Sequence, residues 1–346
     1  LGSRIAEVHN GSSLFTGDAG QGESNIRRWI IENDWLEAIV ALPLNMFYNT
    51  GIATYIWVLT NRKPEHRRGK VQLIDATACF QPLRRNLGKK NCELGEREIE
   101  HILETFLAFE ETEESRIFPN EHFGYWKVTV ERPLRLRADL SAGRRAGLRR
   151  ACRAAKEEPL ADLADRLAER LGPGPHRDWN AFLVTAEEEA DRWGPKLTAK
   201  RTRLLQTELA ERDEEAEPVI RSRRRARPGD DADTERGALY GRYLVHERGT
   251  PWVTEYEPDT ELRDTEQVPL PEEGGIEAFF LREVLPYAPD AWIDEKQTKI
   301  GYEISFTRVF YKPQSLRTLE EIRADILEVQ RESEGLLDGI LGNTQP

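Results

Sequence analysis

Three short, almost uninterrupted apolar segments in the first eighty residues constrain this chain more than any other feature. They are residues 36–42, 52–59 and 71–75, and together they are rich in β-branched and aromatic side chains. A strand that is apolar on both faces belongs to a sheet that is covered on both sides. Residues 4–80 are therefore predicted to form part of a doubly wound α/β domain.

The first strand and the first helix of this domain have recognisable limits. Residues 4–8 suit a short strand that stops at a turn-forming pair. The apolar residues Ile26, Trp29 and Ile30 follow the spacing of one helical face, and Ser24 is expected to cap that helix. The alternation of strand and helix supports the α/β prediction.

The remaining elements are predicted from the same periodicities. They are a helix at 96–110, an extended segment at 123–130, helices across 138–215 with a break at 172–175, a mobile charged segment at 218–236, a helix at 275–285, an extended segment at 299–311 and a long helix at 319–341. The corresponding regions are an α/β sheet at 1–80, an extension with a helix and a strand at 81–137, a helical region at 138–215, a charged linker or insertion at 216–274 and a C-terminal region with a long helix at 275–346.

Charge and cysteine content limit the compartment and the cofactors. Asp and Glu outnumber Lys and Arg by 62 to 50 in the 346 residues, which gives a net charge of −12. No apolar run approaches the ~18 residues that a membrane-spanning helix needs. Cys79, Cys92 and Cys152 lie too far apart for a disulfide framework or a zinc cage. These features predict a cytoplasmic protein that needs no metal and contacts no membrane.

Four basic clusters interrupt the acidic background, at residues 62–70, 84–90, 144–150 and 221–227. Such clusters can contact the phosphate backbone of a nucleic acid, although many basic clusters are only solvated faces of helices and loops. The sequence leaves both interpretations open for each cluster.

Two short patterns imitate cofactor sites without meeting their requirements. Gly17, Gly20 and Gly22 have the spacing GxxGxG, whereas the dinucleotide-binding fingerprint is GxGxxG directly after a strand. A flexible surface loop is predicted instead. Glu98 and His101 form one half of a di-iron signature, and the sequence lacks the second half.

Asp290, Asp294 and Lys296 imitate the pattern of metal-dependent nucleases. In such a site the two acids lie on neighbouring strands, so that both reach one hard cation. The three residues between Asp290 and Asp294 are too few for a hairpin that returns in register. Nuclease chemistry is therefore the weakest of the hypotheses.

An aromatic segment follows the strand predicted at 36–42. Phe47 and Tyr48 come shortly after Pro43 and before the next strand, which places them at one end of the sheet. Open α/β sheets bind their ligands at such ends, and an exposed aromatic ring there can stack on a nucleic-acid base. The alternative is that Phe47 packs beneath its own loop.

Several segments together resemble the modification (M) subunit of type I restriction–modification systems, an N6-adenine DNA methyltransferase. The longest reads Met-Phe-Tyr-Asn-Thr-Gly-Ile-Ala-Thr at 46–54. The segments that carry the resemblance are 13–17, 23–34, 41–43, 46–54, 69–76, 123–125, 130–136, 262–270, 289–294 and 299–308.

The resemblance implies the C-terminal part of a Rossmann-like methyltransferase sheet, followed by a mainly α-helical region. It implies that residues 1–80 are the C-terminal half of the catalytic domain and that 275–346 is a partner-docking region. It implies that S-adenosylmethionine donates a methyl group to adenine N6 in DNA. In this family the glycine motif for the cofactor and the Asn/Asp-Pro-Pro-aromatic motif lie N-terminal to the part seen here. The sequence has no Pro-Pro pair, so this chain alone is expected to be inactive.

The resemblance also implies roles for particular residues. Phe47, with Tyr48 as the nearby substitute, is expected to stack on the target adenine after it leaves the duplex. Asn49 and Thr50 are expected to line the same pocket. Apart from the resemblance, the basic cluster at 62–70 supplies the candidates for DNA contact, which are Arg67, Arg68 and Lys70.

The implied partners are DNA, the specificity (S) and restriction (R) subunits, and a second M subunit. A competing hypothesis is a non-catalytic assembly module that docks a DNA-specificity subunit. The helix predicted at 319–341 could then pair with a partner helix, or it could pack on its own domain.

Overall fold

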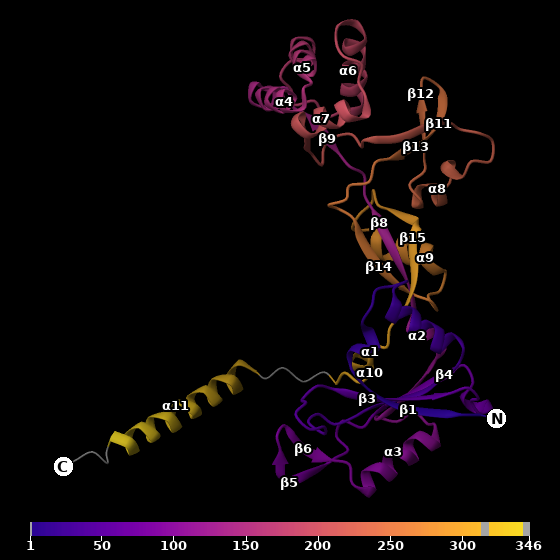
Figure 1. Cartoon of the computed structure of the whole chain (residues 1–346), viewed down its shortest axis with the longest axis vertical. Coiled ribbons are helices and arrows are strands. Elements are labelled where there is room, and N and C mark those ends of the chain that lie inside the picture. The colour runs from indigo at the N-terminus through magenta and orange to yellow at the C-terminus, as the bar shows by residue number, and fades with distance from the viewer. Residues whose placement is uncertain (1, 313–317, 342–346) are drawn as a thin grey trace. The chain divides into compact units, whose positions relative to one another are not determined.

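The computed structural model describes residues 2–312 and 318–341 (Figure 1). The chain divides into two compact units, Leu1–Ile304 and Ser305–Pro346. Among the described residues, no helix is long and apolar enough to cross a membrane.

A five-stranded mixed sheet forms the first part of the larger unit. Its strand order is β1 (Arg4–Asn10), β3 (Thr54–Thr60), β2 (Leu36–Ala41), β4 (Lys70–Asp75) and β7 (Ser115–Pro119). Only β2 and β4 are parallel, and the other neighbours are antiparallel. The α/β class and the predicted strands are confirmed. The sheet is mixed instead of doubly wound, because β3 lies antiparallel between β1 and β2, and it extends past residue 80.

Helices flank this sheet on opposite sides, as Figure 1 shows for α2 (Gly22–Glu32) and α3 (Glu96–Ala108). The central strand β2 is buried at all six positions, whereas the edge strand β1 is exposed at six of seven. Between these elements lie α1 (Ser12–Phe15), the turns η1 (Glu65–Arg67) and η2 (Asn120–Phe123), and a hairpin of β5 (Gln81–Leu87) and β6 (Lys90–Glu93).

Ser24 does not cap α2. The helix starts two residues earlier, with Gln21 at the cap position. The Ser24 hydroxyl is buried and accepts a hydrogen bond of 3.0 Å from the backbone N–H of Tyr302. A serine that has a tertiary partner this close is not available to cap its own helix.

A second, antiparallel sheet has the order β14 (Asp264–Pro269), β8 (Gly124–Glu131) and β15 (Trp292–Tyr302). The helical turns α9 (Gly275–Phe279) and η4 (Phe280–Val284) pack on it. Its core includes Val128, Val130, Phe280 and Ile293. The strand expected at 123–130 and the helix expected near 275–285 are confirmed.

The chain between β8 and β14 first forms a helical bundle. It contains α4 (Ala142–Ala155), α5 (Glu158–Leu171), α6 (Trp179–Trp193) and α7 (Ala199–Leu209). The short strands β9 (Leu136–Ala138), before α4, and β10 (Ala210–Arg212), after α7, pair with each other. Leu148, Leu160, Leu163, Leu167 and Trp179 lie in its core. The predicted helices and their break near 172–175 are confirmed.

The segment predicted to be mobile at 218–236 is structured instead. It contains β11 (Ile220–Arg225), η3 (Asp231–Asp233) and the start of α8 (Glu235–Leu239), and β11 joins β13 (Thr250–Tyr256) and β12 (Tyr243–Glu247) in a sheet. Acidic partners make the arginine-rich strand compatible with this sheet. Arg223 contacts Glu247 at 2.8 Å, and Arg224 contacts Asp230 at 2.7 Å.

The smaller unit contains α10 (Phe306–Val309) and α11 (Leu319–Leu341). The extended segment expected at 299–311 therefore ends with β15, and a short helix follows. The apolar residues Leu319, Ile322, Ile326, Leu327 and Val329 of α11 are exposed.

Candidate functional site

The carboxyl ends of β1, β2 and β4 meet at one edge of the first sheet, which we call the carboxyl edge. In the strand register, Asn10 is opposite Thr54, and Ala41 is opposite both Tyr55 and Asp75. Burial, and then the charge of Asp75, raises the pKa of Tyr55. This edge is where open α/β sheets bind ligands.

The aromatic loop at residues 43–53 connects β2 to β3 along the carboxyl edge. Its turn is tight, since the N–H of Thr50 donates to the carbonyl of Phe47 at 3.5 Å and Asn49 has φ +55°. Phe47 is 37 % exposed and Tyr48 is 68 % exposed. The side chain that packs beneath the loop is Met46, so both aromatic rings reach solvent.

The β5–β6 hairpin lies against this loop. The N–H of Asn91 donates to the carbonyl of Asn45 at 3.1 Å, and the Cys92 thiol donates to the carbonyl of Leu44 at 3.2 Å. Gly88 at the hairpin tip has φ +63°, and a Cβ there would lie 2.4 Å from Oδ1 of Asn49. The left-handed backbone at the tip favours glycine at this position, and the tip lies close to the aromatic loop.

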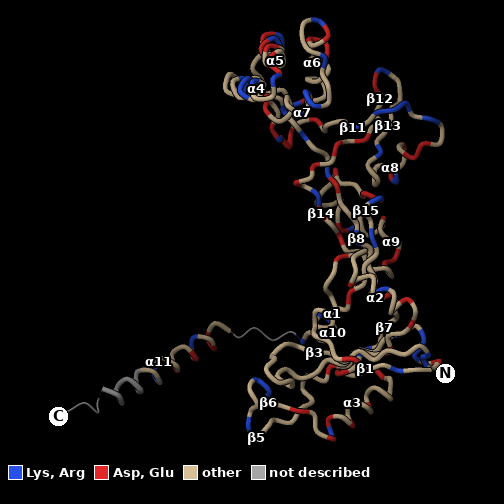
Figure 2. Tube along the Cα trace, in the orientation of Figure 1, with Lys and Arg blue, Asp and Glu red and all other residues tan. Residues whose placement is uncertain are grey.

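The hairpin brings a basic cluster next to the aromatic loop. Arg84, Arg85 and Lys89 are exposed, and Figure 2 shows cationic positions along this hairpin. The sequence identified the cluster at 84–90 as one of four, but nothing in it indicated that this cluster would lie beside Phe47 and Tyr48. A pairing of residues 81–93 with the turn at 44–49 carries no sequence signal.

The candidates for DNA contact at residues 67–70 lie at the opposite edge, because Lys70 begins β4 and Asp75 ends it. Lys70 is exposed, and Arg68 is exposed and paired with Glu65 at 2.6 Å. The structure therefore does not bring these residues together with the aromatic loop.

The structure corrects the prediction that Arg67 contacts DNA, because only 3 % of this residue is exposed. Its guanidinium lies 3.7 Å from the buried carboxylate of Glu37 and donates to the carbonyl of Phe106. It also lies 4.2 Å from the ring centre of Phe106 and 4.3 Å from that of Phe109. A guanidinium enclosed in this way cannot contact a phosphate.

The glycine loop between α1 and α2 is occupied by the protein itself. Buried Arg27 donates to the carbonyls of Ser13 and Thr16 at 3.1 and 2.7 Å. The aliphatic part of Lys299 packs against Gly20, where a Cβ would lie 3.3 Å from it. This loop therefore does not form a cradle for a nucleotide-like cofactor, although α1 does lie at the carboxyl edge.

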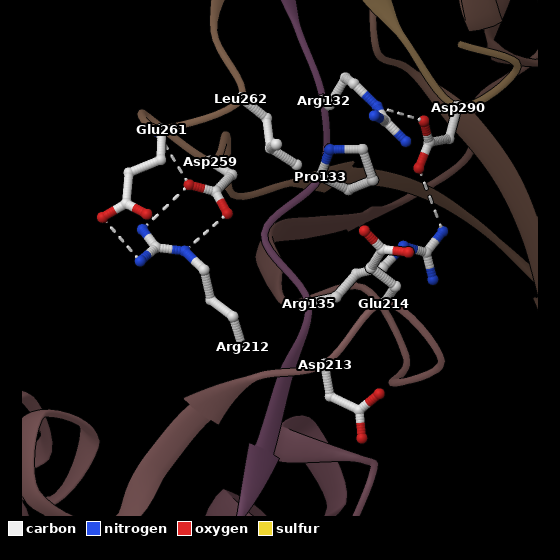
Figure 3. Close-up of a pocket in the computed structure, with 10 residues that line it drawn as sticks. All are labelled: Arg132, Pro133, Arg135, Arg212, Asp213, Glu214, Asp259, Glu261, Leu262 and Asp290. Carbon is white, nitrogen blue, oxygen red and sulfur yellow. Dashed lines mark hydrogen bonds and ion pairs between the residues drawn. The ribbon is translucent and has the colours of Figure 1, made fainter. Parts of the chain in front are cut away.

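A charged cavity of about 530 Å³ lies near the point where the chain leaves β8 (Figure 3). Arg132 and Arg135 contact Asp290 at 2.8 and 3.5 Å, and Arg212 contacts Asp259 at 2.9 Å. Burial raises the pKa of Asp259, but its hydrogen bonds from Arg212 and Glu261 outweigh burial and lower it overall. The drawn guanidinium groups thus already have carboxylate partners.

The same contacts remove support for a nuclease. Asp290 pairs with two arginines, while Asp294 accepts hydrogen bonds from the backbone N–H of Lys296 and the side chain of Gln297. Both carboxylates therefore stabilise the local structure. Glu98 also has a structural role, since its carboxylate accepts a hydrogen bond from the backbone N–H of Gly95 at the start of α3.

Only one group of potential metal ligands is found in the described part of the chain. It consists of Cys79, His101 and Glu114, whose ligand atoms all lie within 4.8 Å of one another. His101 thus faces Glu114 and not its sequence neighbour Glu98.

Comparison with known proteins relates the first part of the chain to DNA methylases. Residues 2–129 match the family described as N-6 DNA Methylase. The chain is 35 % identical over 133 residues to the type I restriction enzyme MjaIX methylase subunit of Methanocaldococcus jannaschii, covering 38 % of this chain and 23 % of the relative. It is 34 % identical over 112 residues to the MjaVII methylase subunit of the same organism, covering 32 % and 18 %.

A solved type I restriction–modification methyltransferase subunit from Streptococcus thermophilus is also similar, with 26 % identity and a TM-score of 0.30, covering 35 % of this chain and 24 % of that one. The resemblance to type I methylase subunits is confirmed for the N-terminal part. The chain spans less than a quarter of the length of these relatives.

Proposed function

We propose, because residues 2–129 match the N-6 DNA methylases, that this chain is part of a type I DNA methyltransferase subunit that methylates adenine N6. The observation that carries the proposal is the position of the aromatic loop at the carboxyl edge. Two exposed aromatic side chains next to a basic hairpin suit a base taken out of the duplex and the phosphates beside it.

In this proposal Phe47 stacks on the adenine, Tyr48 supports or replaces it, and Asn49 and Thr50 line the pocket. Arg84, Arg85 and Lys89 contact phosphates close to the base. Arg68 and Lys70, at the other edge of the sheet, remain proposed phosphate contacts away from the base.

S-adenosylmethionine supplies the methyl group in the proposed reaction. The glycine loop between α1 and α2 does not fit this cofactor, since Arg27 and Lys299 pack against it. We therefore assign the cofactor to residues of the subunit outside this loop, and we assign to this chain the binding of the target base. The cytoplasm is the proposed location, because DNA is the substrate.

The proposed partners are DNA, the S and R subunits and a second M subunit, with α11 as a docking helix for the assembly. A purely non-catalytic assembly module is not favoured, because the match to methylases covers the sheet that bears the aromatic loop.

Phe47→Ala is expected to reduce methyl transfer by about 5- to 150-fold, which corresponds to ~1–3 kcal/mol for one stacked base. The measurement is transfer of a labelled methyl group to DNA by the assembled methyltransferase. Tyr287→Ala is the matched control, because Tyr287 is 86 % exposed and lies outside the carboxyl edge. Full activity of Phe47→Ala would reject the stacking role.

The double variant Arg84→Gln with Arg85→Gln is expected to weaken DNA binding for all sequences. Each lost phosphate contact makes the negative slope of log affinity against log salt shallower by about 1. Binding is measured between low and moderate salt with the assembled enzyme. Arg150→Gln with Arg153→Gln, on α4, is the control pair; an equal change of slope in both double variants would contradict the special role of the hairpin.

A further inference from the structure

Three segments converge beside the carboxyl edge, and each contributes one potential metal ligand. Cys79 lies in the turn after β4, His101 lies in the second turn of α3, and Glu114 immediately precedes β7. Backbone hydrogen bonds hold two of the segments in place. The N–H of Cys79 donates to the carbonyl of Ala76 at 3.0 Å, and the N–H of Asp75 donates to the carbonyl of Glu114 at 2.8 Å.

The ligand atoms are close enough to share one ion. Sγ of Cys79, a ring nitrogen of His101 and a carboxylate oxygen of Glu114 lie within 4.8 Å of one another, and Nε2 of His101 is 2.8 Å from Oε2 of Glu114. Tetrahedral zinc with the usual bond lengths separates such ligand atoms by about 3.3–3.6 Å. Side-chain movements of about 1 Å are therefore sufficient to form the site.

The surroundings suit a site with three protein ligands. Cys79 packs against the core cluster of the sheet, together with Met46 and Ile102. The side chains of His101 and Glu114 are about half exposed, at 51 % and 46 %, which leaves the fourth position to water. A thiolate and a carboxylate together neutralise the two charges of zinc, and sulfur with imidazole favours zinc over magnesium or calcium.

We propose that Cys79, His101 and Glu114 form a binding site for Zn²⁺. A bound ion would link the turn after β4 to α3 and to the start of β7. Since Cys79 is two residues before β5, the ion would also hold the base of the β5–β6 hairpin in place. This site was not predicted, because its ligands come from three separate segments with no recognised spacing. This proposal does not depend on the proposed methyltransferase function.

The test uses the full 346-residue chain and Zn²⁺ alone. The chain is stripped with a chelator and dialysed against Zn²⁺, and bound zinc is measured by mass spectrometry. We expect one equivalent, and we expect the Co²⁺ form to show thiolate-to-cobalt charge transfer. Zinc is also expected to slow tryptic cleavage at Arg84, Arg85 and Lys89, because it fixes the hairpin.

Cys79→Ser and His101→Gln are each expected to weaken zinc binding by at least about 100-fold, the upper end of what loss of an outer-shell partner costs. His9→Gln is the control, because His9 also pairs with a glutamate, Glu7 at 3.4 Å, but has no cysteine in its group. Circular dichroism shows whether each variant is folded. If Cys79→Ser is misfolded, the zinc affinity of His101→Gln tests the proposal, because the His101 side chain is about half exposed and its replacement should leave the fold intact.

Less than stoichiometric zinc in the intact chain would overturn the proposal. So would tight zinc binding that persists in His101→Gln, or cobalt spectra without thiolate charge transfer. Loss of zinc in the control His9→Gln, with retention in His101→Gln, would place the metal elsewhere and would equally reject the site.

Discussion

Arg67→Ala is expected to lower the free energy of unfolding by about 3–5 kcal/mol, the range for breaking a buried ion pair. The substitution removes one cationic partner from Glu37, whose side chain is 1 % exposed, and removes the cation between the rings of Phe106 and Phe109. Arg4 still contacts Glu37 at 2.8 Å, which keeps the loss within this range. Urea unfolding of the full chain measures it.

The neighbouring arginine provides the matched control. Arg68 is exposed and pairs with exposed Glu65, so Arg68→Ala is expected to change stability by at most about 0.5 kcal/mol. If Arg67→Ala were as mild as Arg68→Ala and weakened DNA binding instead, the assignment of Arg67 to the core would be wrong.

Arg27→Ala is expected to destabilise the larger unit by at least about 3 kcal/mol. Its guanidinium donates to the carbonyls of Tyr302, Ser13 and Thr16 at 2.7, 3.1 and 2.7 Å. Each buried carbonyl left without a donor costs about 1–3 kcal/mol. Faster proteolysis of the loop at 16–21 is expected together with the lower stability, because the Thr16 carbonyl lies in that loop and the Ser13 carbonyl lies in α1 just before it.

Two substitutions test whether geometry or charge matters at position 27. Arg27→Lys keeps the charge, but one ammonium group does not replace a planar fork that reaches three carbonyls; most of the destabilisation should remain. Arg28→Ala removes an exposed i,i+4 pair with Glu32 and should cost about 0.3–0.5 kcal/mol. Full rescue by lysine would show that charge alone is needed.

Strands β2, β3 and β4 were predictable because they carry their own signal, whereas β7 of the same sheet was not predicted. The buried positions of β2 and β3 leave 36–42 and 52–59 almost entirely apolar, whatever their neighbours are. β11 carries no such signal, since Ile220 is followed mostly by arginines. Its stability as a strand comes from β13 and from acids such as Glu247, which sequence periodicity does not reveal.

The same distinction separates the site predictions. The position of Phe47 followed from a single feature, the end of a buried strand, and the structure leaves its ring exposed. Arg67 was misassigned because a buried arginine and a surface arginine look alike in a sequence, and its partners Glu37 and Phe106 belong to other elements. The proposed metal site was likewise not predictable, because Cys79 and Glu114 come together with His101 only when three segments of the chain meet in the fold.

The contact between Arg27 and Tyr302 joins residues separated by 275 positions, and this has a consequence for synthesis on the ribosome. At ~5–20 residues per second, roughly 15–55 s pass between the emergence of the arginine and that of its partner. During this interval the N-terminal sheet can form, but the carbonyl that completes the guanidinium's hydrogen bonds does not yet exist. The nascent first sheet should therefore be most open to proteases and chaperones in that interval, until β15 arrives.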